Sequence, residues 1–238
     1  MPDTIRDILT RLHDCCTGTV NRSLADEFNA INGASYAYSS DLDHWITVLD
    51  GRPEKALYAT AANEFALALL NNSQGQYRNA YKGLRLTLEL VLQGVYLSAN
   101  LVVLNEWLTS QADTSWSAIV DGDNGIFSKR FCRAFFPEVT DDAAAFGALS
   151  GTLYREMSEC THGNVPNKIP LPKTIEFNRS TFEMWHAKAE TLRYISNFAL
   201  TVRYYSSLSA EKKQRISPTI LDQLGSVNQI RTTLEATA

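Results

Sequence analysis

The fold class is decided by one stretch, residues 76–108: QYRNAYKGLRLTLELVLQGVYLSANLVVLNEWL. It contains no proline and is rich in leucine, which favours helices. Its apolar side chains recur three or four positions apart, as on one face of a helix. They are Leu84, Leu88, Val91, Val95, Ala99 and Val102. The pattern predicts a single long helix from Gln76 to Leu108.

A second long helix is predicted just before this stretch, from Glu54 to Leu70. No proline occurs between Glu54 and Phe136, so nothing in the composition interrupts either helix. The connection between them, residues 71–75 (NNSQG), is short and polar. A short connection between two helices favours antiparallel neighbours, and we therefore expect a long helix hairpin at the centre of the molecule.

The rest of the chain also reads as helical, and no convincing strand-like alternation is present. Further helices are expected at about Asp3–Cys16, Asp41–Leu49, Thr181–Ser207 and Ser217–Leu234, and in the segment that ends at His162. Ile5, Ile8, Leu9 and Leu12 share one face of the first helix. We predict an all-α bundle in a single domain, residues 1–238, with a core at about 54–207 and a C-terminal helical extension at 209–238.

The composition and net charge argue against several classes of function. The 238 residues are 45% hydrophobic and carry a net charge of −4, which argues against binding nucleic acid through a broad basic surface. The four cysteines form no Cys-x-x-Cys pair, and we expect no metal and no cofactor. The most apolar segment, Leu88–Leu104, is interrupted by polar residues, so we expect no membrane span and a cytoplasmic protein.

The segment Tyr154–Asn164 combines a cation and a titratable base near a predicted helix end. Counting about 100° per residue, Arg155, Ser158, Glu159 and His162 lie opposite the apolar face, and Gly163 ends the helix. An arginine can clamp a phosphate and a histidine can transfer a proton near neutral pH. Together they suit cleavage of a phosphodiester by its own 2′-hydroxyl. A simpler interpretation is that Arg155 pairs with Glu159.

Two further groups of charged residues are candidates for the site. Arg85 and Glu89 lie four residues apart on the central helix and can form an ordinary intrahelical pair, or need further partners if they are buried. Lys129, Arg130 and Arg133 form the densest basic cluster and alternate with phenylalanines. They are either a cationic face over an aromatic core contact or an RNA-binding site.

An arginine followed by six residues and a histidine, near a helix end in an all-helical bundle, resembles the motif of HEPN domains. The resemblance covers roughly Gln76–Asn164 and extends to helical proteins of bacterial defence and toxin systems. It implies a metal-independent endoribonuclease, usually a homodimer with the two motifs facing each other across a cleft. Arg155 would then hold the scissile phosphate and His162 act as acid or base. Ser158 or Asn164 would orient them, with Tyr154, Glu159, Arg85 and Glu89 in support.

One residue departs from the family pattern, and one alternative function stays open. The family commonly has Asn, Asp or His directly after the arginine, whereas this chain has Glu156. Many HEPN-like domains are inactive, so the alternative is a non-catalytic helical module that docks a partner or binds a nucleotide. An antitoxin or another defence-system protein would be the expected partner in either case.

Overall fold

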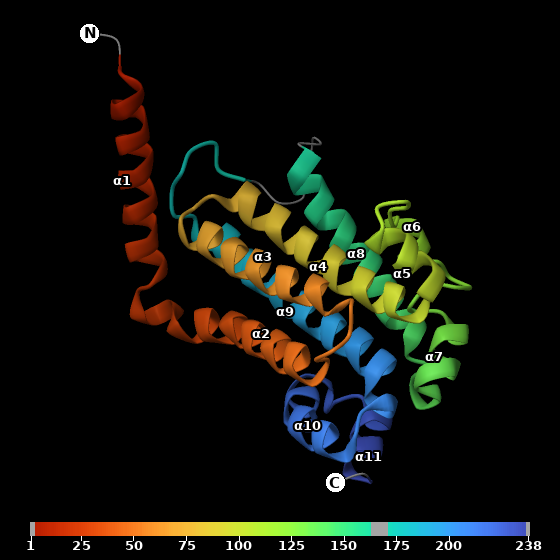
Figure 1. The fold of residues 1–238 in the computed structure, drawn as a ribbon. Coiled ribbons are helices and arrows are strands. Elements are labelled where there is room, and N and C mark those ends of the chain that lie inside the picture. The colour runs from red at the N-terminus through yellow and green to blue at the C-terminus, as the bar shows by residue number, and fades with distance from the viewer. Residues whose placement is uncertain (1–2, 163–170, 237–238) are drawn as a thin grey trace.

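The computed structural model describes residues 3–162 and 171–236, with only the backbone of His162. Within these ranges the chain is all-α and contains no strand, as predicted (Figure 1). The α-helices are α1 (Ile5–Ser23), α2 (Asn29–Val48), α3 (Lys55–Ser73), α4 (Tyr77–Ala99), α5 (Leu101–Leu108), α6 (Trp116–Ile119), α7 (Lys129–Phe135), α8 (Ala143–His162), α9 (Arg179–Tyr204), α10 (Ala210–Leu224) and α11 (Asn228–Glu235). Three short 3-10 helices lie at Asp26–Phe28, Pro137–Val139 and Tyr205–Ser207.

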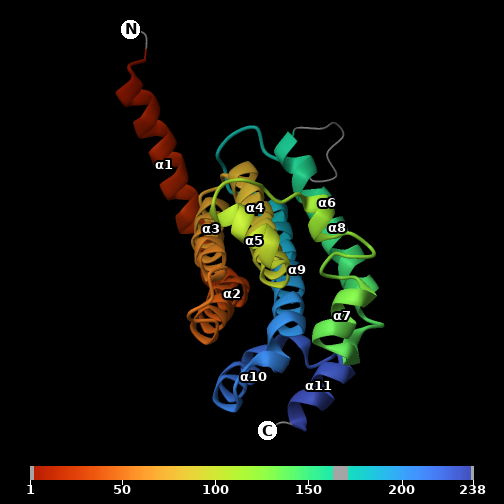
Figure 2. The same ribbon diagram turned by 45° about the vertical axis from the view of Figure 1, so that its right-hand side comes forward.

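The α3–α4 hairpin is present and α4 is its inner member. α4 packs against α3, α8 and α9, and α3 and α8 flank it on different sides (Figure 2). Two glycines let its neighbours come close. A Cβ on Gly83 would lie 2.6 Å from the Cβ of Ala68, and one on Gly94 would lie 2.6 Å from the ring of Tyr58. Both distances are too short for real carbon atoms, so the hairpin depends on these glycines.

The prediction of one helix from Gln76 to Leu108 was wrong beyond Ala99. The chain leaves the helical conformation at Asn100, which has φ −127° and ψ 77°. The Asn100 side-chain amide donates to the carbonyl of Tyr96, so it occupies an acceptor at the end of α4. α5 then starts in a new direction, and Val102, expected on the buried stripe, is 72% exposed.

Other predicted bounds also changed. α1 continues to Ser23 and α2 begins at Asn29, twelve residues before the predicted start at Asp41. The last predicted helix, Ser217–Leu234, is in fact two: Pro218 lies inside α10, and α11 follows after a break at residues 225–227. Local propensity did not locate these ends because each depends on packing of the whole helix.

A buried polar network joins α2 to α9. Arg193 donates to both carboxylate oxygens of Asp41, at 2.6 and 3.1 Å, and one of these oxygens also accepts from Asn197 at 2.9 Å. Asn197 in turn accepts a hydrogen bond from the indole of Trp45 at 2.9 Å. Because every bond needs a defined geometry, the network fixes the register of α2 on α9.

The close approach at Gly83 can be tested with a matched pair of substitutions. Gly83→Ala should lower the free energy of unfolding by about 1 kcal/mol, because overpacking costs about 1–3 kcal/mol and the gain in helix propensity is about 1 kcal/mol. Gly151→Ala in α8, where no atom lies within 4 Å of the added methyl, should instead stabilise the protein. Urea unfolding of both variants makes the comparison, and equal effects would contradict the packing described.

Candidate functional site

The count of about 100° per residue predicted correctly which face of α8 is buried. Leu153, Met157 and Cys160 are buried, and Arg155 is exposed on the other face. Arg155 has no hydrogen bond or ion pair to any residue that the structure describes, so the simpler interpretation, a pair with the half-buried Glu159, is not observed. The side chain of His162 and all of Asn164 lie outside the described residues.

Tyr154 connects α8 to α4. Its hydroxyl oxygen accepts a hydrogen bond from Arg85 Nη2 at 2.7 Å, and the same nitrogen lies 3.1 Å from Glu89 Oε1. The pair of Arg85 and Glu89 is therefore half-buried and has a partner on another helix, which an ordinary intrahelical pair lacks. Partial burial, followed by the nearby carboxylate of Glu89, raises the pKa of Tyr154, so its hydroxyl stays protonated.

Trp116 is a member of this group that the sequence did not reveal. Its ring stacks flat on Tyr154, with ring centroids 3.9 Å apart and planes 8° apart. The short helix α6 therefore lies against α8 at Tyr154. No local pattern marks Trp116, because it stands in a four-residue helix, α6, whose position depends on the tertiary structure.

α4 carries a basic stripe that sequence reasoning missed. Arg78 and Lys82 precede Arg85 by seven and three positions, so the three cations share one side of the helix. Arg78 Nη1 donates to the carbonyl of Cys160 at 2.6 Å, while Arg85 reaches Tyr154. These two contacts show that α4 and α8 run antiparallel, with the exposed Lys82 between them. The seven-residue spacing from Arg85 back to Arg78 was the available signal.

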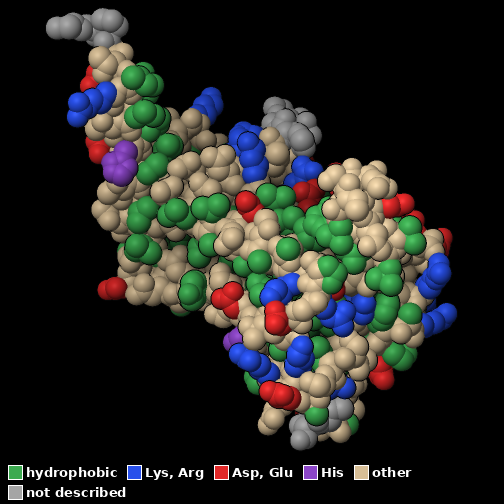
Figure 3. All heavy atoms as spheres, in the orientation of Figure 1, with side chains coloured by type: hydrophobic (Ala, Val, Ile, Leu, Met, Phe, Trp, Pro, Cys, Tyr) green, Lys and Arg blue, Asp and Glu red, His purple; other side chains and the backbone are tan. Residues whose placement is uncertain are grey.

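The basic stripe, Arg78, Lys82 and Arg85, lies along the last turns of α8, where Arg155 is exposed. In the space-filling view, a few Lys and Arg side chains lie at the end of the bundle where α4 begins and α8 ends, and more lie in the lower half of the view (Figure 3). A cation at a helix C-terminus is favourable, because unpaired carbonyl groups accumulate there. Lys82 and Arg155 are exposed and have no hydrogen bond or ion pair to the described residues, so both are available to an anionic ligand.

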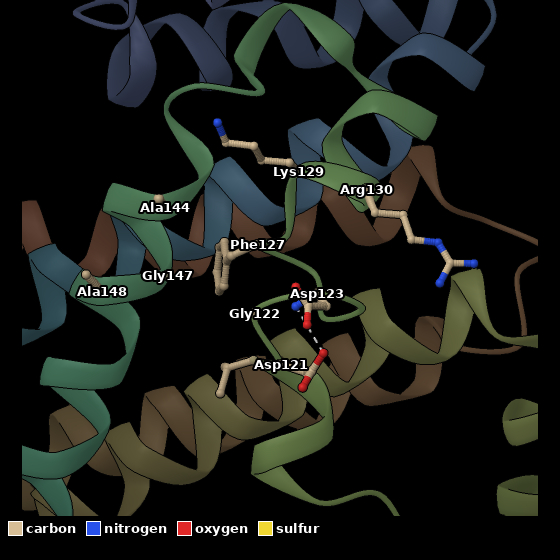
Figure 4. A pocket seen from close by; sticks show the side chains of 10 residues that line it. Asp121, Gly122, Asp123, Phe127, Lys129, Arg130, Ala144, Gly147 and Ala148 are labelled. Atoms are coloured by element: carbon tan, nitrogen blue, oxygen red, sulfur yellow. Dashed lines mark hydrogen bonds between the residues drawn. The ribbon is translucent and has the colours of Figure 1, made fainter.

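The second predicted group, on α7, lies elsewhere. Lys129 and Arg130 line a cavity of about 570 Å³ with Asp121, Asp123 and the first turns of α8, and the two basic side chains point in different directions (Figure 4). Arg130 bonds to Asn124 at 2.5 Å. The cavity reaches Ala148 of α8, seven residues before Arg155 and fourteen before His162, so roughly 10 and 20 Å of helix separate it from them. No hydrogen bond or ion pair among the described residues joins this cluster to Arg155.

The cavity also does not present a uniformly positive surface. Asp121 accepts hydrogen bonds from the backbone N–H groups of Asp123 and Asn124, which hold the pKa of its carboxyl below the ordinary value. Lys129 lies 3.8 Å from Asp141. Phe131 is buried while Lys129, Arg130 and Arg133 are exposed, which agrees with a cationic face over an aromatic contact.

One pair with catalytic residue types is buried and has a structural role. Ser35 Oγ and His186 Nδ1 are 2.6 Å apart, on α2 and α9, and both residues are almost completely buried. Burial lowers the pKa of His186 to about 4, so the imidazole is neutral in the folded protein. Because no substrate reaches the pair, it serves the packing of α2 on α9.

The described residues show neither a metal-binding cluster nor a membrane-spanning helix. Across residues 3–162 and 171–236, no three His, Cys, Asp or Glu side chains come together as a metal site. Within the same residues, no helix has both the length and the apolar character needed to cross a membrane. No protein-family model matches the chain, and comparison with curated proteins and with solved structures gives no match either.

The neutral state of His186 predicts how stability depends on pH. As pH falls from about 6.5 to about 4, the unfolded chain binds a proton that the folded chain excludes, so the folded state loses stability. The variant His186→Gln lacks this titration. Relative to that variant, the wild type should lose up to about 1.4 kcal/mol per pH unit in this interval. Parallel stability curves, from urea unfolding at several pH values, would contradict the assignment.

The orientation of α8 predicts the reactivity of its cysteine. Burial raises the pKa of Cys160 to about 11, and the same holds for Cys132, whereas Cys15 is exposed. Since the thiolate is the reactive form, a thiol reagent at pH 8 should label Cys15 and leave Cys132 and Cys160 unmodified until denaturant is added. Peptide mass spectrometry identifies the sites, and rapid labelling of Cys160 in the folded protein would show that α8 faces the other way.

Proposed function

We propose that the protein is a HEPN-like, metal-independent endoribonuclease that uses Arg155 and His162. The observation that carries the proposal is the exposed guanidinium of Arg155, which has no described partner and lies beside the basic stripe of α4. An exposed cation that has no partner among the described residues, close to other cations, suits a ligand with regularly spaced negative charges. Single-stranded RNA is such a ligand.

The reaction follows from the roles of the two residues. The 2′-oxygen of the RNA attacks the adjacent phosphorus and loses its proton to a base, while the bond from phosphorus to the 5′-oxygen breaks and that oxygen gains a proton. The products are a 2′,3′-cyclic phosphate and a 5′-hydroxyl. Arg155 stabilises the charge that builds up on the phosphate, and His162 moves the proton.

The surrounding residues position these two. Arg85 and Trp116 hold Tyr154, the neighbour of Arg155, and Arg78 holds the last turn of α8. Lys82 is exposed between them and is assigned to a neighbouring phosphate. The hydroxyl of Ser158 donates to the carbonyl of Tyr154, so Ser158 can only accept a hydrogen bond from a ligand.

The wider setting is part of the same proposal. In a cytoplasmic homodimer, two copies of the Arg155 surface would face one cleft, which would collect basic side chains in a chain whose net charge is −4. A role in a toxin or anti-phage defence system, with an antitoxin or another defence protein as partner, follows from the resemblance alone.

A specific observation favours the alternative, a non-catalytic HEPN-like module that docks a partner or binds a nucleotide. Glu156, which stands where the family commonly has Asn, Asp or His, forms an ion pair with Lys188 of α9 at 2.5 Å. Its carboxylate therefore serves the contact between α8 and α9. In a non-catalytic module, Arg155 and the basic stripe would bind an anionic group without cleaving it.

Purified protein should cleave single-stranded RNA in the presence of EDTA. His162→Ala and Arg155→Ala should each lower the rate by about 10²–10⁴-fold with folding intact, because general acid–base and charge stabilisation are lost. Arg215→Ala, an exposed cation on α10, is the matched control and should leave the rate unchanged. Cleavage that persists in His162→Ala would rule out the proposed mechanism. RNA binding without cleavage would establish the alternative.

A further inference from the structure

The apolar stripe of α1 has no partner in this chain. Ile5 is 71%, Leu9 58% and Leu12 45% exposed, and every described residue from Asp3 to Cys15 is exposed. Figures 1 and 2 show the reason: the N-terminal half of α1 projects from the bundle, past the end where α8 stops. Four large aliphatic side chains, including Ile8, therefore lie on one side of the projecting half of the helix, in which every described residue is exposed.

α1 is held as a helix by local contacts alone over this half. Thr4 and Asp7 form a capping box, and Arg11 pairs with Asp3 at 2.8 Å. The buried residues of α1 in the described structure, Thr19 and Ser23, both belong to its last turns. Since helices in water take most of their stability from packing of an apolar face, such a projecting helix requires a partner.

The outer face of α3 is suited to pack against the apolar stripe of α1. The exposed positions of this helix recur three and four residues apart, so they form one continuous outer face, and none of them is charged. They are Ala56, Ala59, Thr60, Asn63, Ala66, Leu67 and Leu70. Three alanines let another helix approach closely, and Leu67 and Leu70, 53% and 48% exposed, supply apolar area near the C-terminal end.

α1 does not cover the α3 face of its own chain. The two helices meet only near the end of α3, where the methyl group of Thr19 lies close to Gly75, and α1 then leads away from the bundle. A second copy offers the same face within reach of the projecting half. Leu67 and Leu70 lie at the end of the bundle past which α1 projects, so two copies meeting end to end would bring each stripe to the partner's α3.

We propose that α1 is an arm that packs its stripe against the outer face of α3 in a second copy of the chain, and that both copies do so reciprocally. Such an exchange is closed by twofold symmetry. Because two arms are exchanged, the dimer buries twice the area that a single arm would bury. This larger area favours a stable interface, which needs about 800 Å² on each partner.

Pairing of the two arms with each other is less favourable. Arg6 flanks the stripe on one side and Arg11 on the other, while Asp7 and Asp14 point away from it. An antiparallel pair places each flank next to the same flank of the partner helix, so Arg6 would meet Arg6 on one side, whereas Arg11 on the other side is already paired with Asp3. The uncharged face of α3 imposes no such repulsion.

The inference uses only α1 and α3, so it does not depend on the proposed ribonuclease activity. The arm would hold the second copy at the end of the bundle where α8 stops, which is compatible with a cleft there. The two proposals can be separated by experiment. His162→Ala should lose RNA cleavage while the dimer stays intact. A variant of the arm should lose the dimer while folding stays intact.

The test measures molar mass by light scattering across a dilution series. The full-length chain should be a dimer, and Leu9→Glu and Leu67→Glu should each raise the dissociation constant at least 100-fold, because each buries a charge in the contact. Thr10→Glu, on the opposite face of α1, is the matched control and should remain dimeric. Circular dichroism confirms that the variants are folded.

A mixing experiment distinguishes arm exchange from other contacts. An equimolar mixture of Leu9→Glu and Leu67→Glu chains retains one intact arm and face per mixed pair, so part of the dimer should return. A dimer that Leu67→Glu leaves unchanged would overturn the proposal in favour of arms that pair with each other. A wild-type chain that stays monomeric, whether or not it binds lipid vesicles through α1, would also overturn it.

Discussion

The structure depends on how closely α3 and α4 approach each other. At Gly83 the backbone of α4 meets Ala68 at a distance that excludes a side chain, and at Gly94 the ring of Tyr58 takes the place of one. This contact allows α4 to be enclosed, because α8 and α9 then cover its remaining sides. Arg85, on the edge of α4, bonds to Glu89 of the same helix and to Tyr154 of α8. The packing of the core thus decides which polar groups can meet at the surface.

The helix class, the hairpin and the orientation of α8 could be predicted from the sequence because each follows from the period of apolar residues. The break at Asn100 could not, because Val102 continues the apolar period beyond the point where the Asn100 side chain bonds to the carbonyl of Tyr96. The exposed stripe of α1 shows a second limit of prediction from the apolar period. Its period correctly predicts a helix, and it does not say whether the partner lies in the same chain.

The candidate site likewise contains some residues that could be predicted from the sequence and others that could not. Arg155 could be placed on the outer face by counting residues, and the pair of Arg85 and Glu89 by its four-residue spacing. Trp116 could not, because its stacking on Tyr154 joins positions 38 residues apart through a loop that carries no motif. The α7 cluster was conspicuous in sequence because its cations are close along the chain. In space they diverge, whereas Arg78 and Lys82, more widely spaced, line up beside α8.

The contacts between α2 and α9 have a consequence for the order in which the molecule is made. Ser35 meets His186, Tyr38 meets Ser196 and Trp45 meets Asn197, across sequence separations of 151, 158 and 152 residues. The ribosome therefore releases α2 long before its buried partner exists, and during that time Trp45 and Tyr38 have no core to enter. The hairpin of α3 and α4, by contrast, can form as soon as it emerges. Surface charges on α8 are synthesised before α9 supports that helix, so the Arg155 face takes its final form only after α9 has been synthesised.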